Sequence, residues 1–140
     1  AVLDTEGAVW TVGCNDEGSL GRVVGEEEEC FVPGKVEIEE KVVGISAGDS
    51  HSAALTETGQ VWVWGTFRDS SGPIGLLTWG QLEKTPVKVE LPTRNGDAVV
   101  KVASGADHLA LLTRDGDIWT LGNHSRYFLF PDLILTHNCR

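Results

Sequence analysis

The chain has 140 residues, of which 41% are hydrophobic and 23% are charged, a composition that suits one folded domain and excludes a disordered segment. Its 21 acidic residues outnumber 11 basic ones, and the net charge of −10 disfavours direct nucleic-acid binding, because cationic side chains drive phosphate contact. A basic partner surface fits this charge better, and no apolar run is long enough for a membrane span.

Residues 1–22 are predicted to be the end of an incomplete repeat. They contain "EGAVWTVG", which reads as a turn followed by a short strand that stops at a glycine. The acidic run "GEEEEC", residues 25–30, follows and is expected to be a solvated loop. The first residue is not Met and the chain opens within the pattern, so we expect a piece of a longer protein.

Residues from about 32 to 77 form a full repeat of short strands. Period-2 alternation, β-branched runs and a glycine turn are the signals of half-buried strands and tight hairpins. In chain order these segments are "PGKVEIE", "KVVGISAG", "HSAALT", the turn "ETGQ" and "VWVWG".

Residues from about 86 to 122 repeat the same series. The corresponding segments are "PVKVELP", "VVKVASG", "HLALLT", "RDGD" and "IWTLG". Trp10, Trp62 and Trp119 fall at one position of the repeat and are expected in the core, whereas Trp79 lies outside the register and is expected at the surface.

The spacing of the repeats defines the fold class. About four short strands recur every 50 to 60 residues, which is typical of a propeller blade or a solenoid coil. No segment has apolar residues at the 3.6-residue spacing of an amphipathic helix, so we predict an all-β chain. It would form a partial β-propeller of about two full blades plus part of another, too few to close a ring.

Residues 123–140, "NHSRYFLFPDLILTHNCR", are expected to form an atypical tail that departs from the repeat. The tail lacks the glycine-rich turn expected after Gly122. It could come from truncation, from alternative splicing or from translation of an unspliced transcript. Cys14, Cys30 and Cys139 are odd in number and far apart, which favours free thiols. The His and Cys residues show no ligand spacing, so we expect no metal and no other cofactor.

The succession Asp49, Ser50 and His51 invites a hydrolase interpretation, which we reject. Adjacent side chains on an extended strand point to opposite faces, so these three cannot form a triad with one another. His51 and His108 occupy equivalent repeat positions, "GDSH" and "GADH", and are expected to satisfy buried backbone groups.

The acids beside these histidines are not equivalent. Asp49 aligns with Ala106, and Asp107 aligns with Ser50, so two carboxylates lie in neighbouring loops without a shared position in the repeat. This arrangement argues against a purely architectural duty. The insert "TFRDSSGPIG" adds a long hairpin, which is either a solvated tip or a functional loop on a rigid scaffold.

With the repeats placed, the chain resembles the regulator of chromosome condensation family over about residues 1–122. The likeness is carried by "VGCNDEGSLGR", "GISAGDSHSAALTETGQVWVWG" and "VVKVASGADHLALLTRDGDIWTLG", and most specifically by "GTFRDSSGPIGLL", residues 65–77. The resemblance implies a seven-bladed propeller and a chromatin-associated guanine nucleotide exchange factor for the small GTPase Ran. Such a protein acts without covalent chemistry and serves nucleocytoplasmic transport and mitosis.

The resemblance also implies roles for residues and partners. Asp49 and Asp107 would face Ran and support exchange, and the insert would be a wedge pressed against the nucleotide-binding elements of the GTPase. The wedge residues are Phe67, Arg68, Asp69, Ser70, Ser71 and Gly72. Nucleosome contacts would lie in parts of the protein outside this chain. The location would be the nucleus, on chromatin, and the cytoplasm when chromatin contact is lost.

Two other functions are compatible with the sequence. The first is a regulator-like repeat module that binds or scaffolds protein partners without exchange activity. The second is a non-functional product, an incomplete ring with unpaired edges. The insert favours exchange over scaffolding, because a generic repeat module would not need it.

Overall fold

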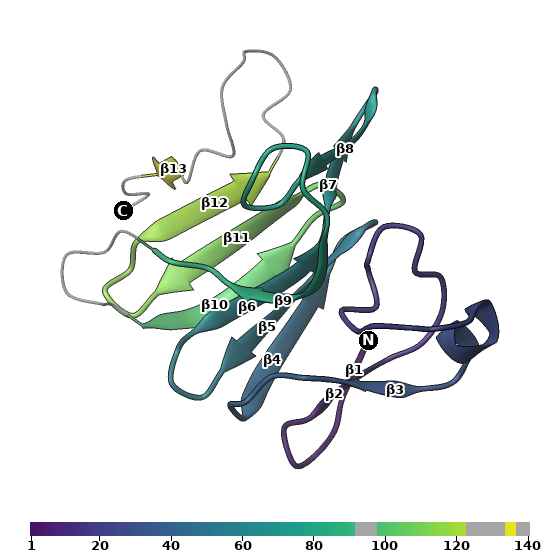
Figure 1. Ribbon diagram of the computed structural model, residues 1–140. Coiled ribbons are helices and arrows are strands. Elements are labelled where there is room, and N and C mark those ends of the chain that lie inside the picture. The colour runs from purple at the N-terminus through teal and green to yellow at the C-terminus, as the bar shows by residue number, and fades with distance from the viewer. Residues whose placement is uncertain (92–97, 123–133, 137–140) are drawn as a thin grey trace.

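A computed structural model describes residues 1–91, 98–122 and 134–136 of the chain. These residues form three antiparallel sheets of successive strands, a small hairpin and one short 3-10 helix, η1 (Glu27–Phe31). The sheets lie side by side in chain order (Figure 1). The all-β prediction is confirmed.

The strands of each sheet follow one another closely in the sequence. The first sheet contains β1 (Val2–Leu3), β2 (Val9–Thr11) and β3 (Gly34–Val36). The second contains β4 (Val42–Ala47), β5 (His51–Thr56), β6 (Val61–Gly65) and β9 (Glu83–Lys88). The third contains β10 (Val99–Ser104), β11 (His108–Thr113), β12 (Ile118–Gly122) and β13 (Ile134–Thr136). Between β6 and β9, the strands β7 (Phe67–Asp69) and β8 (Gly72–Gly75) form the hairpin.

The sequence repeat and the sheet are offset by one strand. The segment that opens the repeat at about residue 32 supplies β3, which pairs with β2 of the preceding sheet. In the same way, β9 pairs with β6, with Val63 opposite Val87. The first and second sheets are therefore each completed by a segment that the sequence groups with the following repeat, which ties neighbouring sheets together.

Three residues of the tail also enter a sheet. The strand β13 pairs with β12, with Trp119 opposite Leu135, in the place that β9 takes on β6. The rest of the tail, including the apolar cluster at residues 127–130 and Cys139, lies outside the described residues.

The core lies between the sheets, and this explains the small side chains of β5. All six residues of β5 are buried, because the second sheet is covered on both faces. Ala53 and Leu55 pack with the third sheet, whereas Ala54 packs toward the first. In the equivalent strand β11, Leu109 and Leu111 are buried against the second sheet, while residues of the opposite face are more exposed.

The tryptophans of the repeat series differ in burial. Trp10, Trp62 and Trp119 occupy β2, β6 and β12 as expected, but Trp10 is 38% exposed and donates from Nε1 to the Asp4 carboxylate at 2.9 Å. The core prediction is confirmed for Trp119 and wrong for Trp10. The fully buried tryptophan is Trp64, outside the series, which packs between the first two sheets.

The acidic run and the cysteines can be compared with their predictions. Glu26–Glu29 are exposed as expected, although residues 27–31 form η1 and not an open loop. Cys14 is exposed, Cys30 is buried, and neither forms a disulfide. In the part of the chain that the structure describes, no helix could cross a membrane and no cluster of His, Cys, Asp or Glu could hold a metal ion.

Candidate functional site

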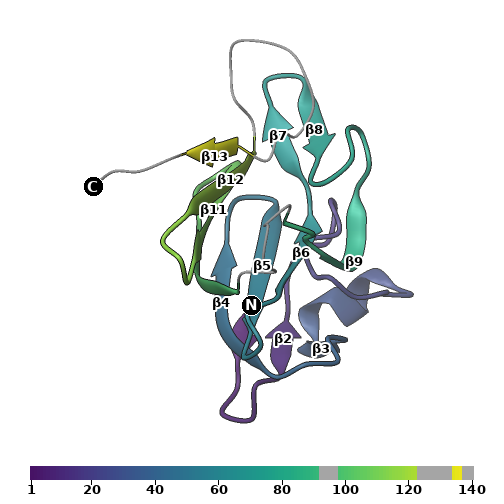
Figure 2. The same ribbon diagram turned by 90° about the vertical axis from the view of Figure 1, so that its left-hand side faces the viewer.

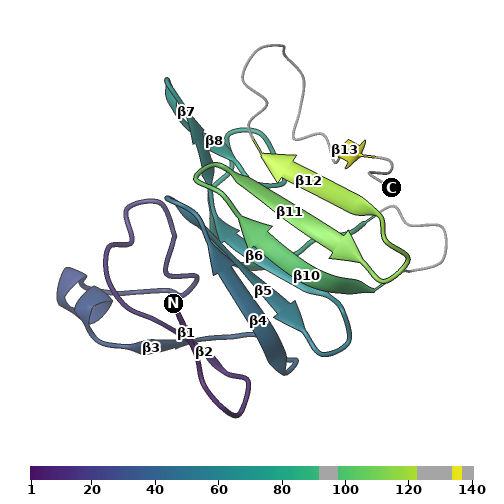
Figure 3. The ribbon, with the colours of Figure 1, turned by 180° about the vertical axis from the view of Figure 1, so that it is seen from behind.

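Two loops and the hairpin meet at one end of the sheets. The loop from β4 to β5 carries Asp49, and its backbone N–H donates to the Ala106 carbonyl of the β10–β11 loop at 3.0 Å. The strand β6 reaches the same end, since Gly65 pairs with His51. Figure 2 shows the hairpin β7–β8 projecting beyond the ends of the strands, and Figure 3 shows the same projection from behind.

The close approach of the two loops depends on Gly48. A Cβ atom at Gly48 would lie 2.4 Å from the Gly105 carbonyl oxygen and 2.5 Å from that of Ala106. Contacts of this length with backbone atoms cannot be relieved by a side-chain rotation. The glycine of "GDSH" is thus required for packing one loop against the next, which brings the segments of Asp49 and Asp107 together.

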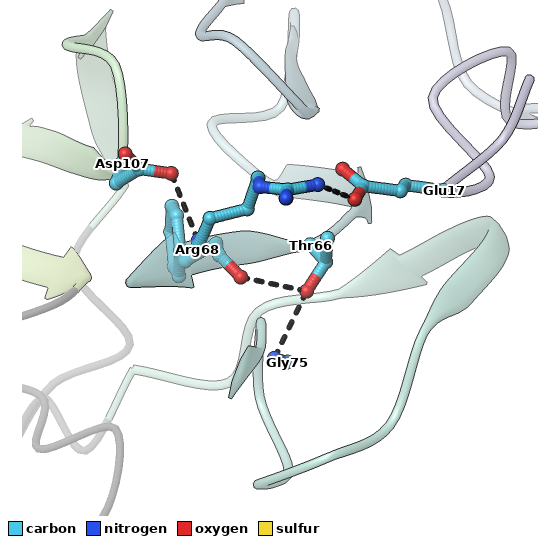
Figure 4. A network of polar contacts seen from close by, with 6 residues as sticks. Glu17, Thr66, Arg68, Gly75 and Asp107 are labelled. Carbon is cyan, nitrogen blue, oxygen red and sulfur yellow. Dashed lines mark hydrogen bonds and ion pairs between the residues drawn. The ribbon is translucent and has the colours of Figure 1, made fainter. Parts of the chain in front are cut away.

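The base of the hairpin is fixed by a buried threonine. Thr66 is fully buried, and its N–H donates to the Ser50 carbonyl at 2.9 Å. Its Oγ1 donates to the Phe67 carbonyl and accepts from the Gly75 N–H, each at 2.9 Å (Figure 4). One hydroxyl group therefore joins the two strands where they leave the second sheet.

Phe67 anchors the hairpin from below. The sequence placed it on the partner-contacting surface, but its ring is buried in the core between the second and third sheets. It packs edge-on against His51, with ring centroids 4.7 Å apart. The surface assignment of Phe67 is therefore wrong, because burial of its apolar ring is favourable at the base of the hairpin.

The remaining predicted wedge residues form the projecting part. Asp69 pairs with Gly72 across the hairpin, and its Oδ1 accepts the Ser71 N–H at 2.7 Å, which orders the tip. Ser70 and Ser71 are exposed, and Gly72 has φ of 125°, a conformation that favours glycine. The tip is a small, polar and well-ordered turn.

Arg68 connects the hairpin to both neighbouring sheets. Its backbone N–H donates to Asp107 Oδ1 at 2.8 Å, and its guanidinium forms an ion pair with Glu17 (Figure 4). Asp107 precedes β11 of the third sheet, while Glu17 lies in the loop that follows β2 of the first. Sequence reasoning missed Glu17, because its partner is 51 residues away and no repeat pattern marks the pair.

The two predicted acids therefore occupy different environments. Asp107 is half-buried and its carboxylate holds the hairpin backbone. Asp49 is exposed, and its backbone N–H donates to the Ala106 carbonyl. Asp49 is available to a partner at the surface, whereas Asp107 combines its position near the surface with a structural contact.

The histidines differ from the prediction in two respects. His51 is fully buried as expected, but neither ring nitrogen has a hydrogen-bond partner, so it satisfies no backbone group. His108, at the equivalent position, is exposed. The unpartnered ring of His51 also forms no pair with Ser50, which is consistent with rejecting a hydrolase triad.

Burial lowers the pKa of His51 to about 4, against the attraction of the nearby Asp107 carboxylate. The unfolded chain, with an ordinary pKa near 6.5, binds a proton more readily, so the stability from neutral His51 is complete above pH 6.5 and is lost as the pH falls toward 4. We expect the unfolding free energy to fall by about 1.4 kcal/mol per pH unit in this window. Urea unfolding from pH 7.5 to 5 measures it.

His51→Leu should remove this slope, and His108→Leu should keep it. An equal slope in the wild-type protein and His51→Leu would show that another group is responsible.

Comparisons with known proteins agree with the repeats. Residues 6–55 and 58–112 match the family model described as the regulator of chromosome condensation (RCC1) repeat. The regulator of chromosome condensation of Mus musculus is 57% identical over 120 residues, which cover 86% of this chain and 28% of the relative. The guanine nucleotide exchange factor SRM1 of Saccharomyces cerevisiae is 33% identical over an alignment of 151 residues. The alignment covers 86% of this chain and 31% of the relative.

Solved structures share the fold. Prp20p from Saccharomyces cerevisiae, studied for its binding to Gsp1p and histones, matches with a TM-score of 0.77 and 36% identity over 91% of this chain and 32% of its own. Yeast RCC1 (Prp20) in complex with Kap60 gives a structure that matches with a TM-score of 0.76 and 34% identity, over 91% of this chain and 31% of that chain. The likeness confirms a partial β-propeller. The chain spans less than a third of the length of these relatives.

Proposed function

Since this chain belongs to the regulator of chromosome condensation repeat family, we propose that it forms part of a guanine nucleotide exchange factor that promotes GDP release from Ran. Relatives are named as guanine nucleotide exchange factors, which supports the activity class. The observation that carries the proposal is the hairpin β7–β8. It projects from the sheets and is held at Arg68 by acids from both neighbouring sheets.

A hairpin with a fixed base suits nucleotide exchange, because exchange requires contacts that displace the nucleotide and no covalent chemistry. Its buried base, at Thr66 and Phe67, supplies a fixed support, and its polar tip at residues 69–72 is presented to a partner. Pressed against the nucleotide site, the tip would stabilise the nucleotide-free GTPase more than the bound form. By linkage, nucleotide affinity then falls without any covalent step.

Asp49 and Asp107 complete the proposed surface. Both lie beside the hairpin at the same end of the sheets, in loops that contact each other. In the proposal, Asp49 contacts the GTPase directly, and Asp107 acts mainly by holding the hairpin. The net charge of −10 favours encounter with a basic partner surface.

Chromatin association and nuclear location are proposed for the complete protein. The structure of Prp20p, a structural relative, was described together with the binding of Prp20p to histones. The net charge of −10 disfavours DNA contact by this chain, so we assign chromatin contact to regions outside it. A repeat module that scaffolds partners without exchange is the alternative, and it would bind Ran without accelerating nucleotide release.

Asp69→Ala in the complete protein is expected to slow release of labelled GDP from Ran about fivefold. The change removes the acceptor that orders the tip through the Ser71 N–H, and such a bond contributes about 1 kcal/mol. Fluorescence stopped flow measures the release. Glu57→Ala, at an exposed turn before β6, is the control and should behave as the wild type. Binding of Ran without accelerated release by the wild-type protein would favour the scaffold.

A further inference from the structure

We propose that Glu17 is a positioning residue for exchange, which acts through Arg68 to fix the direction of the hairpin β7–β8. The inference rests on the proposed function, because the hairpin is the element that would act on the GTPase. Glu17 itself is set back from the tip and reaches the hairpin by its ion pair with the Arg68 guanidinium (Figure 4).

The loop that carries Glu17 is a rigid support. Ser19 accepts a bond from Trp64 Nε1 at 3.0 Å, and the Leu20 carbonyl accepts one from Thr11 Oγ1 at 2.7 Å. At Gly18, a Cβ atom would lie 2.9 Å from the Lys84 Cα, so the loop packs closely on β9. Glu17 is therefore attached to the first sheet and held against the second.

The hairpin, by contrast, leaves the core directly after its base. Phe67 is the only fully buried residue of β7, and residues 68–74 are exposed or partly covered. The supports described at Arg68 come from opposite sides, with Asp107 on the backbone and Glu17 on the guanidinium. Removing one of them should let the tip swing while the base stays in place.

The burial of the pair also favours a positioning role. The side chain of Glu17 is 15% exposed and that of Arg68 is 44% exposed. Because the Arg68 end of the pair is open to solvent, the ion pair contributes little to stability. Misplacing a reacting group by about 1 Å can nevertheless cost around a hundredfold in rate. Loss of Glu17 should thus affect exchange far more than folding.

The test uses the complete protein and Ran loaded with labelled GDP. Glu17→Gln is expected to lower the maximal release rate at least tenfold and to leave the melting temperature within about 1 °C. Glu17→Asp, which keeps a carboxylate for the Arg68 guanidinium, should retain more of the rate than Glu17→Gln. Glu28→Gln, an equal charge loss on exposed η1, is the matched control and should match the wild type.

Hydrogen exchange of the hairpin amides in the free protein separates this inference from the proposed function. Glu17→Gln should accelerate exchange at residues 68–72 and leave β5 unchanged. An unchanged hairpin in Glu17→Gln, or a release rate in Glu17→Asp as slow as in Glu17→Gln, would overturn the positioning role. A wild-type protein without GDP release would overturn the proposed function, and the amide measurement would still decide whether Glu17 holds the hairpin.

Discussion

Asp107→Ala, introduced into the complete protein, is expected to slow GDP release from Ran by about a hundredfold, or roughly 3 kcal/mol of transition-state stabilisation. The carboxylate accepts the Arg68 N–H at 2.8 Å, at the point where the hairpin leaves its buried base. Without that acceptor, the backbone loses the support from the third sheet, and the tip meets the GTPase in varied orientations. Stopped-flow release at saturating exchange factor measures the effect.

Companion variants separate position from charge. Asp107→Asn keeps an oxygen acceptor and should retain more activity than Asp107→Ala, whereas Asp49→Ala should lower exchange through lost contact with the GTPase. Asp117→Ala removes one charge from an exposed turn and is the control. Wild-type release rates in both Asp49→Ala and Asp107→Ala would end the assignment of this surface.

The fold was predictable because the repeat signals are local. The glycines of "ETGQ" and "RDGD" were expected at turns that need positive φ, and Gly59 and Gly116 have φ of 86° and 94°. The strand before each turn could be located from short apolar runs, and β5 and β11 lie there. Period-2 alternation in "PGKVEIE" indicated a strand, although β3 is confined to Gly34–Val36.

Burial was harder to predict, because it depends on which sheet covers which face. Trp10 and Trp119 share a repeat position, yet Trp10 is exposed beside Asp4 and Trp119 is buried in the core. His51 is buried against the Phe67 ring, whereas His108 is exposed. Equivalent positions in a repeat therefore predict the same strand but not the same environment.

The candidate site was only partly predictable for a related reason. The hairpin and the two acids could be found from the insert and from the repeat alignment. The contacts that fix them join residues far apart in the chain, such as Arg68 with Glu17 and with Asp107. No local pattern encodes such a pair. Phe67 was misassigned because an aromatic residue in a polar insert can serve as its anchor.

Trp64→Ala is expected to lower the unfolding free energy of the complete protein by about 3 to 5 kcal/mol, the usual cost of deleting a buried aromatic side chain. Trp64 is fully buried between the first and second sheets, with Val9, Val36 and Ala54 in the same cluster. Its ring also lies against Gly21, where a Cβ atom would come within 2.7 Å. The space left by the ring cannot be filled by such small neighbours.

Denaturant unfolding of matched variants tests this expectation. Trp79→Ala deletes the same side chain where it is 63% exposed and should change the unfolding free energy by less than about 0.5 kcal/mol. Trp64→Phe keeps much of the ring and loses the bond from Nε1 to the Ser19 carbonyl, which should cost about 1 kcal/mol. Equal stability of Trp64→Ala and Trp79→Ala would show that Trp64 does not join the sheets. Since Ser19 belongs to the loop of Glu17, Trp64→Phe should also slow GDP release more than its small loss of stability explains, because the support of the hairpin has moved.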